Sequence, residues 1–333
     1  MSSFLESLRL GLFDAFEADD RVVLLGEDVL DPYGGAFKVS QGLSTRFPGR
    51  VIGTPISEAG FTGVAAGMAI RGLRPIVEIM FGDFLTLCTD QIVNHITKFA
   101  NMYPGVRVPL VIRTPMGGGR GYGATHSQSL EKMYLGVPGL TVVAPSLAHN
   151  PGALLRHAVI GDDRPVLFVE NKLLYGQSLC GGDHDILSVR FVEDQSGYPT
   201  AVVENRPGHR PDVTLIAYGG VSRPALAVMR RFADEEISIK ALLPASLKPV
   251  PLSGLLAESR GSAALLLIED GSAGFNWGSE IAALLYEFLL PELKQPIRRL
   301  AAEDAVIPCA EPLERQVLVT EEKIEKAIME LLG

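Results

Sequence analysis

The sequence predicts an α/β protein of two domains, the first of them built on a parallel sheet. Short apolar segments typical of buried strands alternate with helical segments, which indicates a sheet covered on both faces. The alternation stops at 181–211, a polar stretch that contains DQSGYP and NRPGHRP, and then resumes. Hydrophobic residues make up 47% of the 333 residues, enough for two sizeable cores. We therefore divide the chain into a first domain at 1–185, a linker with some extended pieces at 186–211, and a second domain at 212–333.

In the first domain, the spacing of the apolar residues predicts the elements. The opening segment, 1–20, is expected to be an amphipathic helix rather than a signal peptide, because Glu6 and Asp14 interrupt its apolar residues. Residues 26–50 are rich in glycine, aspartate and proline and are expected to be mostly loop, with a short helix near 39–47. Strands are expected at 22–25, 75–79, 109–113, 140–144 and 165–169, and helices at 84–102 and 152–160.

The second domain repeats this alternation of strands and helices. Its last helix places apolar residues on one face at helical spacing, which indicates packing against a sheet. Strands are expected at 213–218, 237–242 and 263–268, and helices at 224–232, 278–290 and 321–332.

Composition excludes several classes of function. The net charge is −9 and there is no basic block, which argues against nucleic acid as a partner. No apolar run approaches the roughly 18 residues of a membrane span, so a membrane protein is not expected. Cys88, Cys180 and Cys309 lie far apart, which argues against a disulfide framework or a zinc site. This cysteine usage fits a reducing compartment, and we expect a cytoplasmic location.

The stretch TPISEAGF, residues 54–61, places the carboxylate of Glu58 at the start of a helix. Ser57 is a suitable N-cap, because its hydroxyl can accept a hydrogen bond from a free N–H of the first turn. Residues 61–70 are apolar nearly all round, so we expect the helix to be buried on most sides and Glu58 to have little water nearby. A carboxylate in that setting needs a partner or a catalytic role. A negative charge at a helix N-terminus is also favoured for structural reasons alone, which is the alternative.

Two further residues are candidates for a site. His126 follows the glycine-rich loop 117–123, so it is expected on a mobile and accessible surface. Such a position suits a histidine that acts as an acid in a transfer reaction, and the alternative is an ordinary surface histidine. Phe84 lies where a helix starts after a strand, the edge at which α/β sheets bind ligands, or it packs in the core. The segment GRGYGA at 119–124 matches the dinucleotide-binding spacing GxGxxA. The residues after it are polar and broken by glycine, and no acidic residue follows about 20 positions on to hold a ribose, so we do not expect a nicotinamide site.

In combination, the motifs follow an order that resembles one family. They are GEDV at 26–29, YGGAF at 33–37, TPISEAGF at 54–61, GLRPIVEIMFGDF at 72–84, DQIVNHITK at 90–98, RTPMGGGRGYGATHSQSLE at 113–131, VPGLTVVAPS at 137–146, IEDG at 268–271, GSEIAALL at 278–285 and VIPCAEPLE at 306–314. This order resembles the beta subunit of the thiamin-diphosphate-dependent 2-oxo acid dehydrogenases of the pyruvate and branched-chain type. The resemblance covers essentially the whole chain. It implies a pyrimidine-binding domain of transketolase-like fold, followed by a domain of the transketolase C-terminal type.

The resemblance also implies roles for individual residues. Glu58 matches the glutamate that hydrogen-bonds a ring nitrogen of the cofactor's aminopyrimidine and shares a proton there. Phe84 matches the aromatic residue that stacks on this ring. Ile56 lies in the same motif as Glu58, TPISEAGF, and is expected to contact the cofactor as well. His126 matches the histidine implicated in passing the acyl group to a lipoyl arm. A 2-oxo acid would be the substrate.

Metal sites and partners are implied in the same way. Related proteins bind a potassium ion through backbone carbonyls, which match Leu110, Ala158, Val159 and Asp162, the last of them affected by an apparent one-residue insertion. The magnesium-binding GDG motif with its following asparagine pair is missing from this sequence. We therefore expect an alpha subunit to hold magnesium and the diphosphate, in an assembly of two alpha and two beta chains. A lipoyl acyltransferase core component is expected to dock on the second domain, at the acidic residues Glu269, Asp270 and Glu280.

Some positions depart from the family pattern and leave the substrate open. Asn101 stands where members often have tyrosine, and His95 where a small residue is common. An acetoin-cleaving dehydrogenase, or an enzyme of specialised metabolism with another acyl acceptor, is therefore an alternative. A non-catalytic regulatory subunit is an alternative from another class, and the presence of Glu58 argues against it.

Overall fold

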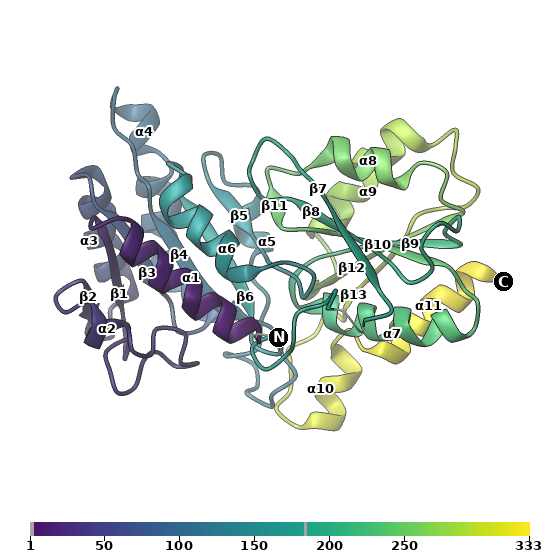
Figure 1. Cartoon of the computed structure of the whole chain (residues 1–333), viewed down its shortest axis with the longest axis horizontal. Helices are drawn as coiled ribbons and strands as arrows, with labels where there is room; N and C mark the ends of the chain where they lie inside the picture. The colour runs from purple at the N-terminus through teal and green to yellow at the C-terminus, as the bar shows by residue number, and fades with distance from the viewer. Residues whose placement is uncertain (1–2, 183–184) are drawn as a thin grey trace.

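The computed structural model describes residues 3–182 and 185–333, which form two α/β units side by side (Figure 1). Within these residues, seven strands build the first sheet in the order β11-β5-β6-β4-β3-β1-β2. All neighbours in it are parallel except β11, which runs antiparallel to β5. The strands are β1 (Val22–Gly26), β2 (Val51–Gly53), β3 (Arg74–Glu78), β4 (Val111–Met116), β5 (Thr141–Val143), β6 (Val166–Asn171) and β11 (Ser246–Lys248).

Helical segments cover both faces of the first sheet, as the alternation predicts. One face packs against α1 and α6, and the other against α3 and the segments that follow β3. The helical segments are α1 (Phe4–Ala18), α2 (Leu43–Arg46), α3 (Glu58–Ile70), α4 (Phe99–Met102), α5 (Lys132–Leu135), α6 (Pro151–Arg156), the 3-10 helix η1 (Gly82–Cys88), and the π-helical segments η2 (Gln91–Ile96) and η3 (His157–Gly161).

The second sheet is mixed. Six strands of the described residues form it in the order β13-β12-β9-β10-β8-β7, and β7 and β8 are its antiparallel edge. These two strands lie in the segment 186–211, which was predicted to be a linker with some extended pieces. The segment therefore contributes two strands to the second sheet. The strands are β7 (Ser188–Val192), β8 (Thr200–Glu204), β9 (Val213–Ala217), β10 (Ile239–Pro244), β12 (Ala264–Ser272) and β13 (Arg298–Ala302).

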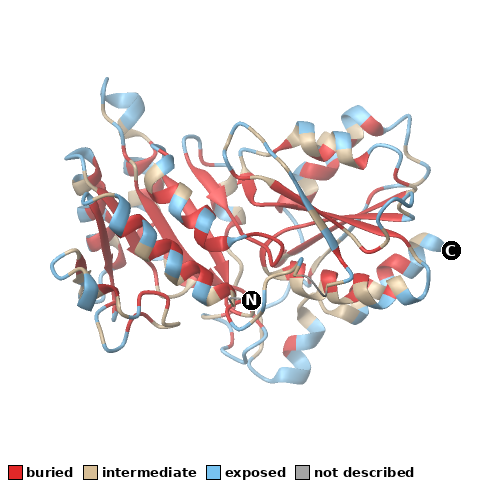
Figure 2. Ribbon diagram, in the orientation of Figure 1, coloured by how far each residue is buried: buried red, intermediate tan, exposed pale blue. Residues whose placement is uncertain are grey.

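Helices again cover both faces of the second sheet, with α7 and α11 on one side and α8 and α9 on the other. Figure 2 shows that the buried residues run along the strands and the inward faces of the helices in both units. The helical segments are η4 (Gly219–Val221), α7 (Ser222–Asp234), α8 (Leu252–Ser259), α9 (Trp277–Leu289), α10 (Glu311–Val317) and α11 (Glu321–Leu332). Among the described residues no helix is long and apolar enough to cross a membrane.

The single helix predicted at 84–102 is wrong, because the structure divides it into η1, η2 and α4. Side-chain hydroxyls compete with the helical hydrogen bonds there. Thr89 Oγ1 donates to the Leu85 carbonyl at 3.1 Å, and Thr97 Oγ1 donates to the Ile92 carbonyl at 3.0 Å. Such back-bonding distorts a regular helix, which explains the change of helical type in spite of the apolar spacing.

The expected burial of α3 on most sides is also wrong. One face, which includes Ala65 and Ala66, is buried, but Gly63, Val64 and Gly67 on another face are exposed. Val64 retains 56% of its surface. The chain alone therefore leaves an apolar helix face uncovered.

A buried ion network stiffens the carboxyl edge of the first sheet. The Arg113 guanidinium on β4 pairs with Glu170 on β6 at 2.6 Å and with Glu78 on β3. Tyr175 donates its hydroxyl to Glu170 at 2.6 Å. Burial raises the pKa of Glu78. Three neighbouring strands are thus tied together at the edge where the candidate residues lie.

Candidate active site

Glu58 is the first residue of α3 and is only 6% exposed, as its position predicts. Ser57 is the N-cap, but no cap hydrogen bond from its side chain is found within the described residues, so its predicted capping role is wrong. A second carboxylate, Glu27, follows β1 and is also buried. Burial raises the pKa of Glu27, and the nearby charge of Glu58 raises it further. Two carboxylates therefore lie together at the carboxyl edge of the sheet.

Glu27 lies in the GEDV motif at 26–29 and was not predicted as a site residue. Its signal was available, because an acidic residue directly after a buried strand lies at the edge where α/β sheets bind ligands. The motif contains Glu27 next to Asp28, and only the fold shows which of the two faces Glu58.

Glu58 also lies near η1, the segment that carries Phe84. The link is Cys88, the last residue of η1, whose thiol is buried. Burial raises the pKa of Cys88 to about 12, and the charge of Glu58 contributes to the rise. The carboxylate, the cysteine and η1 therefore share one apolar corner of the first domain.

The structure brings Phe84 and His126 together, although 42 positions separate them in the sequence. Their ring centroids are 5.3 Å apart with the rings edge to face, and Phe81 contacts His126 at 4.7 Å. Phe84 is half-buried, while Ile56 is 84% exposed. The predicted residues thus lie on the accessible side of the domain, where a ligand or a second chain can reach them.

The loop that carries His126 is held by two buried charged groups. Glu314 of α10 is 2% exposed, and its carboxylate accepts the N–H groups of Gly119 at 2.8 Å and Gly121 at 3.1 Å. Lys172 is fully buried and donates from Nζ to the His126 carbonyl at 2.5 Å. Burial lowers the pKa of Lys172 to about 8. Neither anchoring residue was predicted from the sequence.

Several buried polar atoms around these residues have no hydrogen-bond partner among the described residues. They are Glu27 Oε1, Thr62 Oγ1, Asp83 Oδ2 and Ser127 Oγ. A buried polar group without a partner is costly, so such groups are expected where a ligand completes the site. With the Phe84 ring and the Glu58 carboxylate, these atoms suit a flat heteroaromatic ring that carries hydrogen-bonding nitrogens, as the pyrimidine of thiamin diphosphate does.

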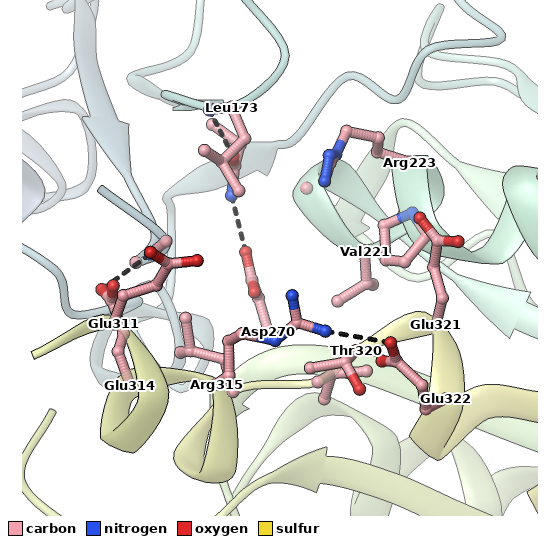
Figure 3. Close-up of a pocket in the computed structure, with 17 residues that line it drawn as sticks. Leu173, Val221, Arg223, Asp270, Glu311, Glu314, Arg315, Thr320, Glu321 and Glu322 are labelled. Atoms are coloured by element: carbon pink, nitrogen blue, oxygen red, sulfur yellow. Dashed lines mark hydrogen bonds and ion pairs between the residues drawn. The ribbon is translucent and has the colours of Figure 1, made fainter. Parts of the chain in front are cut away.

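A cavity of about 400 Å³ lies between the two domains (Figure 3). Its lining includes Gly118 and Gly119 of the loop, Glu314, and Asp270 at the end of β12. The Asp270 carboxylate accepts a hydrogen bond from Asn171 Nδ2 at 2.6 Å. Burial raises the pKa of Asp270 to about 7, and the charge of Glu131 adds to this rise.

The predicted docking role of Glu269 and Asp270 is wrong. Glu269 is 2% exposed and accepts the Gly278 N–H at 3.2 Å, while Asp270 faces the interdomain cavity. Burial raises the pKa of Glu269 to about 7. Of the three residues, Glu280 is the one on the surface. Glu269 is therefore not accessible to a macromolecule, and Asp270 belongs to the lining of the cavity between the domains.

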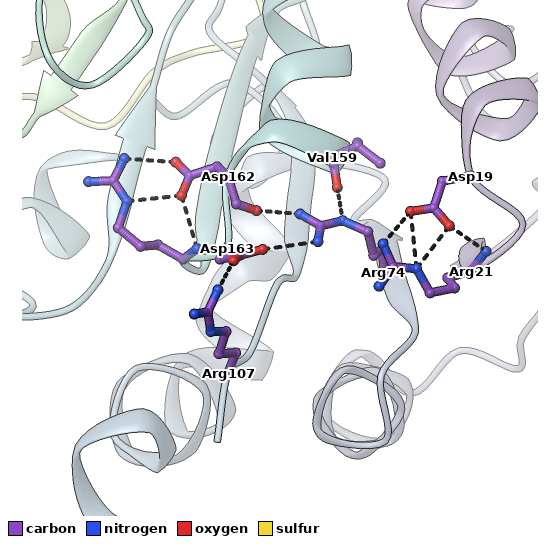
Figure 4. A network of polar contacts seen from close by, with 8 residues as sticks. Asp19, Arg21, Arg74, Arg107, Val159, Asp162 and Asp163 are labelled. Carbon is purple, nitrogen blue, oxygen red and sulfur yellow. Dashed lines mark hydrogen bonds and ion pairs between the residues drawn. The ribbon is translucent and has the colours of Figure 1, made fainter. Parts of the chain in front are cut away.

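Two of the carbonyls predicted to bind potassium already accept hydrogen bonds from Arg74. Its Nε donates to the Val159 carbonyl and its Nη2 to the Asp162 carbonyl, both at 2.6 Å (Figure 4). The Leu110 carbonyl accepts the Val166 N–H at 2.9 Å, and Ala158 lies within η3. These contacts do not fit a potassium ion at the expected position. No cluster of three potential metal-ligating side chains of the His, Cys, Asp and Glu types occurs in the described parts of the chain.

Family models match both units of the chain. Residues 4–177 match the model for the transketolase pyrimidine-binding domain, and residues 202–324 match the transketolase C-terminal domain. Among solved structures, a split-gene transketolase described as an inactive beta4 tetramer has a TM-score of 0.73 at 22% identity, over 99% of this chain and 98% of that one. At that identity the likeness concerns the fold alone.

Curated relatives are similar over nearly the full length. The beta-2 subunit of the mitochondrial pyruvate dehydrogenase E1 component from Oryza sativa subsp. japonica is 36% identical over 97% of this chain and 84% of its own. The beta subunit of acetoin:2,6-dichlorophenolindophenol oxidoreductase from Bacillus subtilis (strain 168) is 34% identical over 96% of this chain and 94% of its own.

Proposed function

Because this chain belongs to the transketolase-like family of beta subunits of thiamin-diphosphate-dependent 2-oxo acid dehydrogenases, we propose that it supplies the pyrimidine half of a shared thiamin diphosphate site. The enzyme decarboxylates a 2-oxo acid of the pyruvate or branched-chain type and transfers the acyl group to a lipoyl group. One observation carries the proposal. The buried carboxylate of Glu58 lies on the same edge of the sheet as the Phe84–His126 contact, amid buried polar atoms that have no partner within the described residues.

Glu58 is the residue that holds and moves a proton in this proposal. Its carboxylate is fixed at the start of α3, where one oxygen can hydrogen-bond a ring nitrogen of the pyrimidine. Burial and the charge of Glu58 raise the pKa of Glu27 beside it, so Glu27 is protonated more readily than an ordinary glutamate. Bound thiamin diphosphate supplies the carbon nucleophile and the electron sink.

Phe84, Ile56 and His126 orient the reactants. The half-buried Phe84 ring offers an apolar face for stacking, and Ile56 is exposed beside the start of α3 and can pack on the cofactor when the site is covered. His126 contacts Phe84, so its imidazole lies beside the ring on which the cofactor would stack and can act on the acyl group as it leaves. The hydrogen bonds from Glu314 and Lys172 fix the loop that places this imidazole.

The site needs a second subunit. The uncovered face of α3 and the exposed Ile56 leave the Glu58 corner open on one side. We propose that an alpha subunit covers this face, holds the magnesium ion and the diphosphate, and completes an assembly of two alpha and two beta chains with closed symmetry. A lipoyl acyltransferase core component accepts the acyl group from this assembly.

Titration calorimetry tests this proposal. The chain alone should bind thiamin diphosphate with magnesium weakly or not at all, and addition of the alpha subunit should restore tight binding. Val64→Lys places a charge on the uncovered face of α3 and should abolish the restored binding, because the charge would be buried without a partner. The matched control is Met329→Lys on α11, where the side chain is similarly exposed at 48%. Tight binding by the chain alone would show that the site is not shared.

Acetoin cleavage is a second candidate, favoured by the similarity to the Bacillus subtilis acetoin oxidoreductase beta subunit. The same Glu58 corner would serve either substrate, because both reactions use the same cofactor chemistry. An assay of the complex with its alpha subunit on a panel of 2-oxo acids and acetoin decides between them.

A further inference from the structure

The cavity between the two domains contains a guanidinium that lacks a partner among the described residues. We propose that this cavity binds a small apolar amino acid, whose carboxylate meets Arg223 and whose ammonium group meets Asp270. Arg223 is the second residue of α7, and its half-buried side chain lines the cavity (Figure 3). Asp270 lines it from the end of β12.

The missing partner of Arg223 indicates an anionic group in the ligand. The two other arginines of α7, Arg230 and Arg231, form ion pairs within the chain at 2.7 and 2.6 Å. Arg223 has no hydrogen-bond partner for its buried Nε among the described residues, and a buried donor left in that state is costly. A guanidinium presents its N–H groups in a fork that matches the two oxygens of a carboxylate or a phosphate.

The carboxylate of Asp270 offers an acceptor for the other end of the ligand. Its Oδ2 accepts the hydrogen bond from Asn171, which leaves Oδ1 for a donor in the cavity. This wall is preformed, because a β-carbon on Gly220 would lie 2.0 Å from Asn171 Nδ2 and 2.6 Å from Asp270 Oδ2. Close packing therefore holds the pair against η4, the segment that leads into α7.

The charges around the cavity favour a zwitterion over a simple anion. Two guanidinium groups, those of Arg223 and Arg315, face five acidic side chains in the lining, so a ligand with a net negative charge would be repelled. The acidic residues are Asp270, Glu311, Glu314, Glu321 and Glu322. A ligand that carries one carboxylate and one ammonium group has no net charge and meets both kinds of side chain.

The rest of the lining suits an apolar side chain. It consists largely of Leu173, Val221, Pro224, Leu318 and Val319. The volume of about 400 Å³ lies in the range of pockets that hold small ligands, roughly 300–1,000 Å³. Gly119 and Glu314 belong to the same lining, so a bound amino acid would adjoin the loop that carries His126.

Titration calorimetry of the full chain at pH 8 tests the proposal, because Asp270, with its pKa of about 7, is mostly ionised there. The probes are L-leucine, L-methionine and L-phenylalanine, and at least one should bind saturably with a Kd of roughly 1 mM or tighter. Analogues that lack one charged group should bind roughly 10-fold or more weakly, since each loses a charge-assisted hydrogen bond. For leucine, the analogues are isoamylamine and 4-methylpentanoate.

Two variants locate the ligand. Arg223→Gln and Asp270→Asn should each weaken the binding of the amino acid by roughly 10-fold or more. Arg156→Gln, at an exposed arginine of α6, is the matched control and should bind as the wild type does. The melting temperatures of the unliganded variants check the fold, and the analogues test the wild-type chain without any substitution.

The absence of saturable binding by all three amino acids would overturn the proposal. Full affinity in Arg223→Gln would do so too, as would equal affinity of the wild type for the amino acid and for the amine without its carboxylate. Binding is measured without turnover, so the outcome is independent of the proposed reaction.

Discussion

Glu58 shares its corner with Glu27, and this pairing determines which substitution is informative. Replacement by alanine would remove a buried side chain and leave Glu27 with a new cavity, so a loss of activity would have several causes. Glutamine keeps the size and one hydrogen-bond acceptor, and it removes the negative charge and the capacity to release a proton.

We therefore expect Glu58→Gln to fold and assemble normally and to reduce turnover by about 10²-fold or more, the range typical of a lost proton transfer. Turnover of the complex with its alpha subunit measures the effect, and the melting temperature checks the fold. Glu17→Gln, an exposed carboxylate on α1, is the control. Turnover close to that of the wild type would contradict the role given to Glu58.

At this scale, the sequence indicated Glu58, Phe84 and His126 because each lies in a short local motif. Glu314 and Lys172 have no such motif, and their roles depend on long-range contacts. Glu314 and Gly119 are 195 positions apart, and Lys172 is 46 positions from His126. An acidic residue in a C-terminal helix has no feature that links it to a distant glycine loop, so only the fold reveals this contact.

The glycine-rich loop is the element on which the proposed acyl transfer depends. Gly119 and Gly121 have positive φ values of 88° and 68°, a conformation that favours glycine. Glycine also loses more conformational entropy on folding than other residues do, so an ordered glycine loop needs contacts that hold it. The two hydrogen bonds to Glu314 restrict that freedom from the other domain. A residue of the second domain therefore holds this loop of the first domain in place.

Glu314→Gln should loosen this loop, because an amide offers one acceptor oxygen and places an N–H₂ group against a backbone donor. Arg120 lies exposed between the two bonded glycines, so trypsin should cleave after it faster in the variant. The appearance of the fragment that ends at Arg120, followed by mass spectrometry, measures the change. Glu311→Gln, an exposed residue of the same helix, should behave as the wild type. Equal cleavage in both variants would show that Glu314 does not hold the loop.

At the level of elements, apolar periodicity predicted most strands and the long regular helices. It failed at 84–102, where the spacing is helical but threonine hydroxyls bond back to the chain. Periodicity reports which residues face the core, and it does not report how the backbone groups are hydrogen-bonded. The short strands β2, β11 and β13 were missed because segments of this length or polarity carry little periodic signal.

At the scale of the whole molecule, the two domains meet through buried acids. Tyr218 of the second domain donates its hydroxyl to Glu131 of the first at 2.6 Å, and Asn171 of the first donates to Asp270 of the second. Burial raises the pKa values of Glu131, Glu269 and Asp270. The folded state therefore holds protons that the unfolded chain would release.

The sign of the pH effect follows from the raised pKa of Asp270, from its ordinary 3.8 to about 7. Its contribution to stability is complete below the unfolded pKa and is lost as pH rises through about 7, because the folded state binds more protons in this window. Asp270→Asn mimics the protonated acid at every pH. The free energy of unfolding of Asp270→Asn, minus that of the wild type, should therefore be more positive at pH 8 than at pH 5.

Urea unfolding at the two pH values measures this difference, followed by the fluorescence of Trp277, the single tryptophan of the sequence. Trp277 is a suitable probe because its ring lies 5.2 Å from Tyr218 at the domain contact. Asp304→Asn, an exposed aspartate, serves as the control and should show no such dependence. A difference between Asp270→Asn and wild type that is the same at both pH values would contradict the prediction.

The division into two α/β domains was predictable, because each domain repeats its own alternation of strands and helices. The way the domains join was not. β11 belongs to the second domain by sequence but pairs with β5 of the first sheet, about 100 residues earlier in the chain. Its three residues give no local sign of a partner so distant.

The placement of β11 also has a consequence for how such chains can be recombined. A first domain cut free after residue 185 would lose its terminal strand and present the bare edge of β5, and an open edge invites pairing between copies. A second domain exchanged for that of a relative would have to bring a matching β11 in the same register. The two domains therefore cannot be exchanged independently of each other. A chimaera of two relatives would have to take β5 and β11 from the same parent, so that the pairing between these strands is kept.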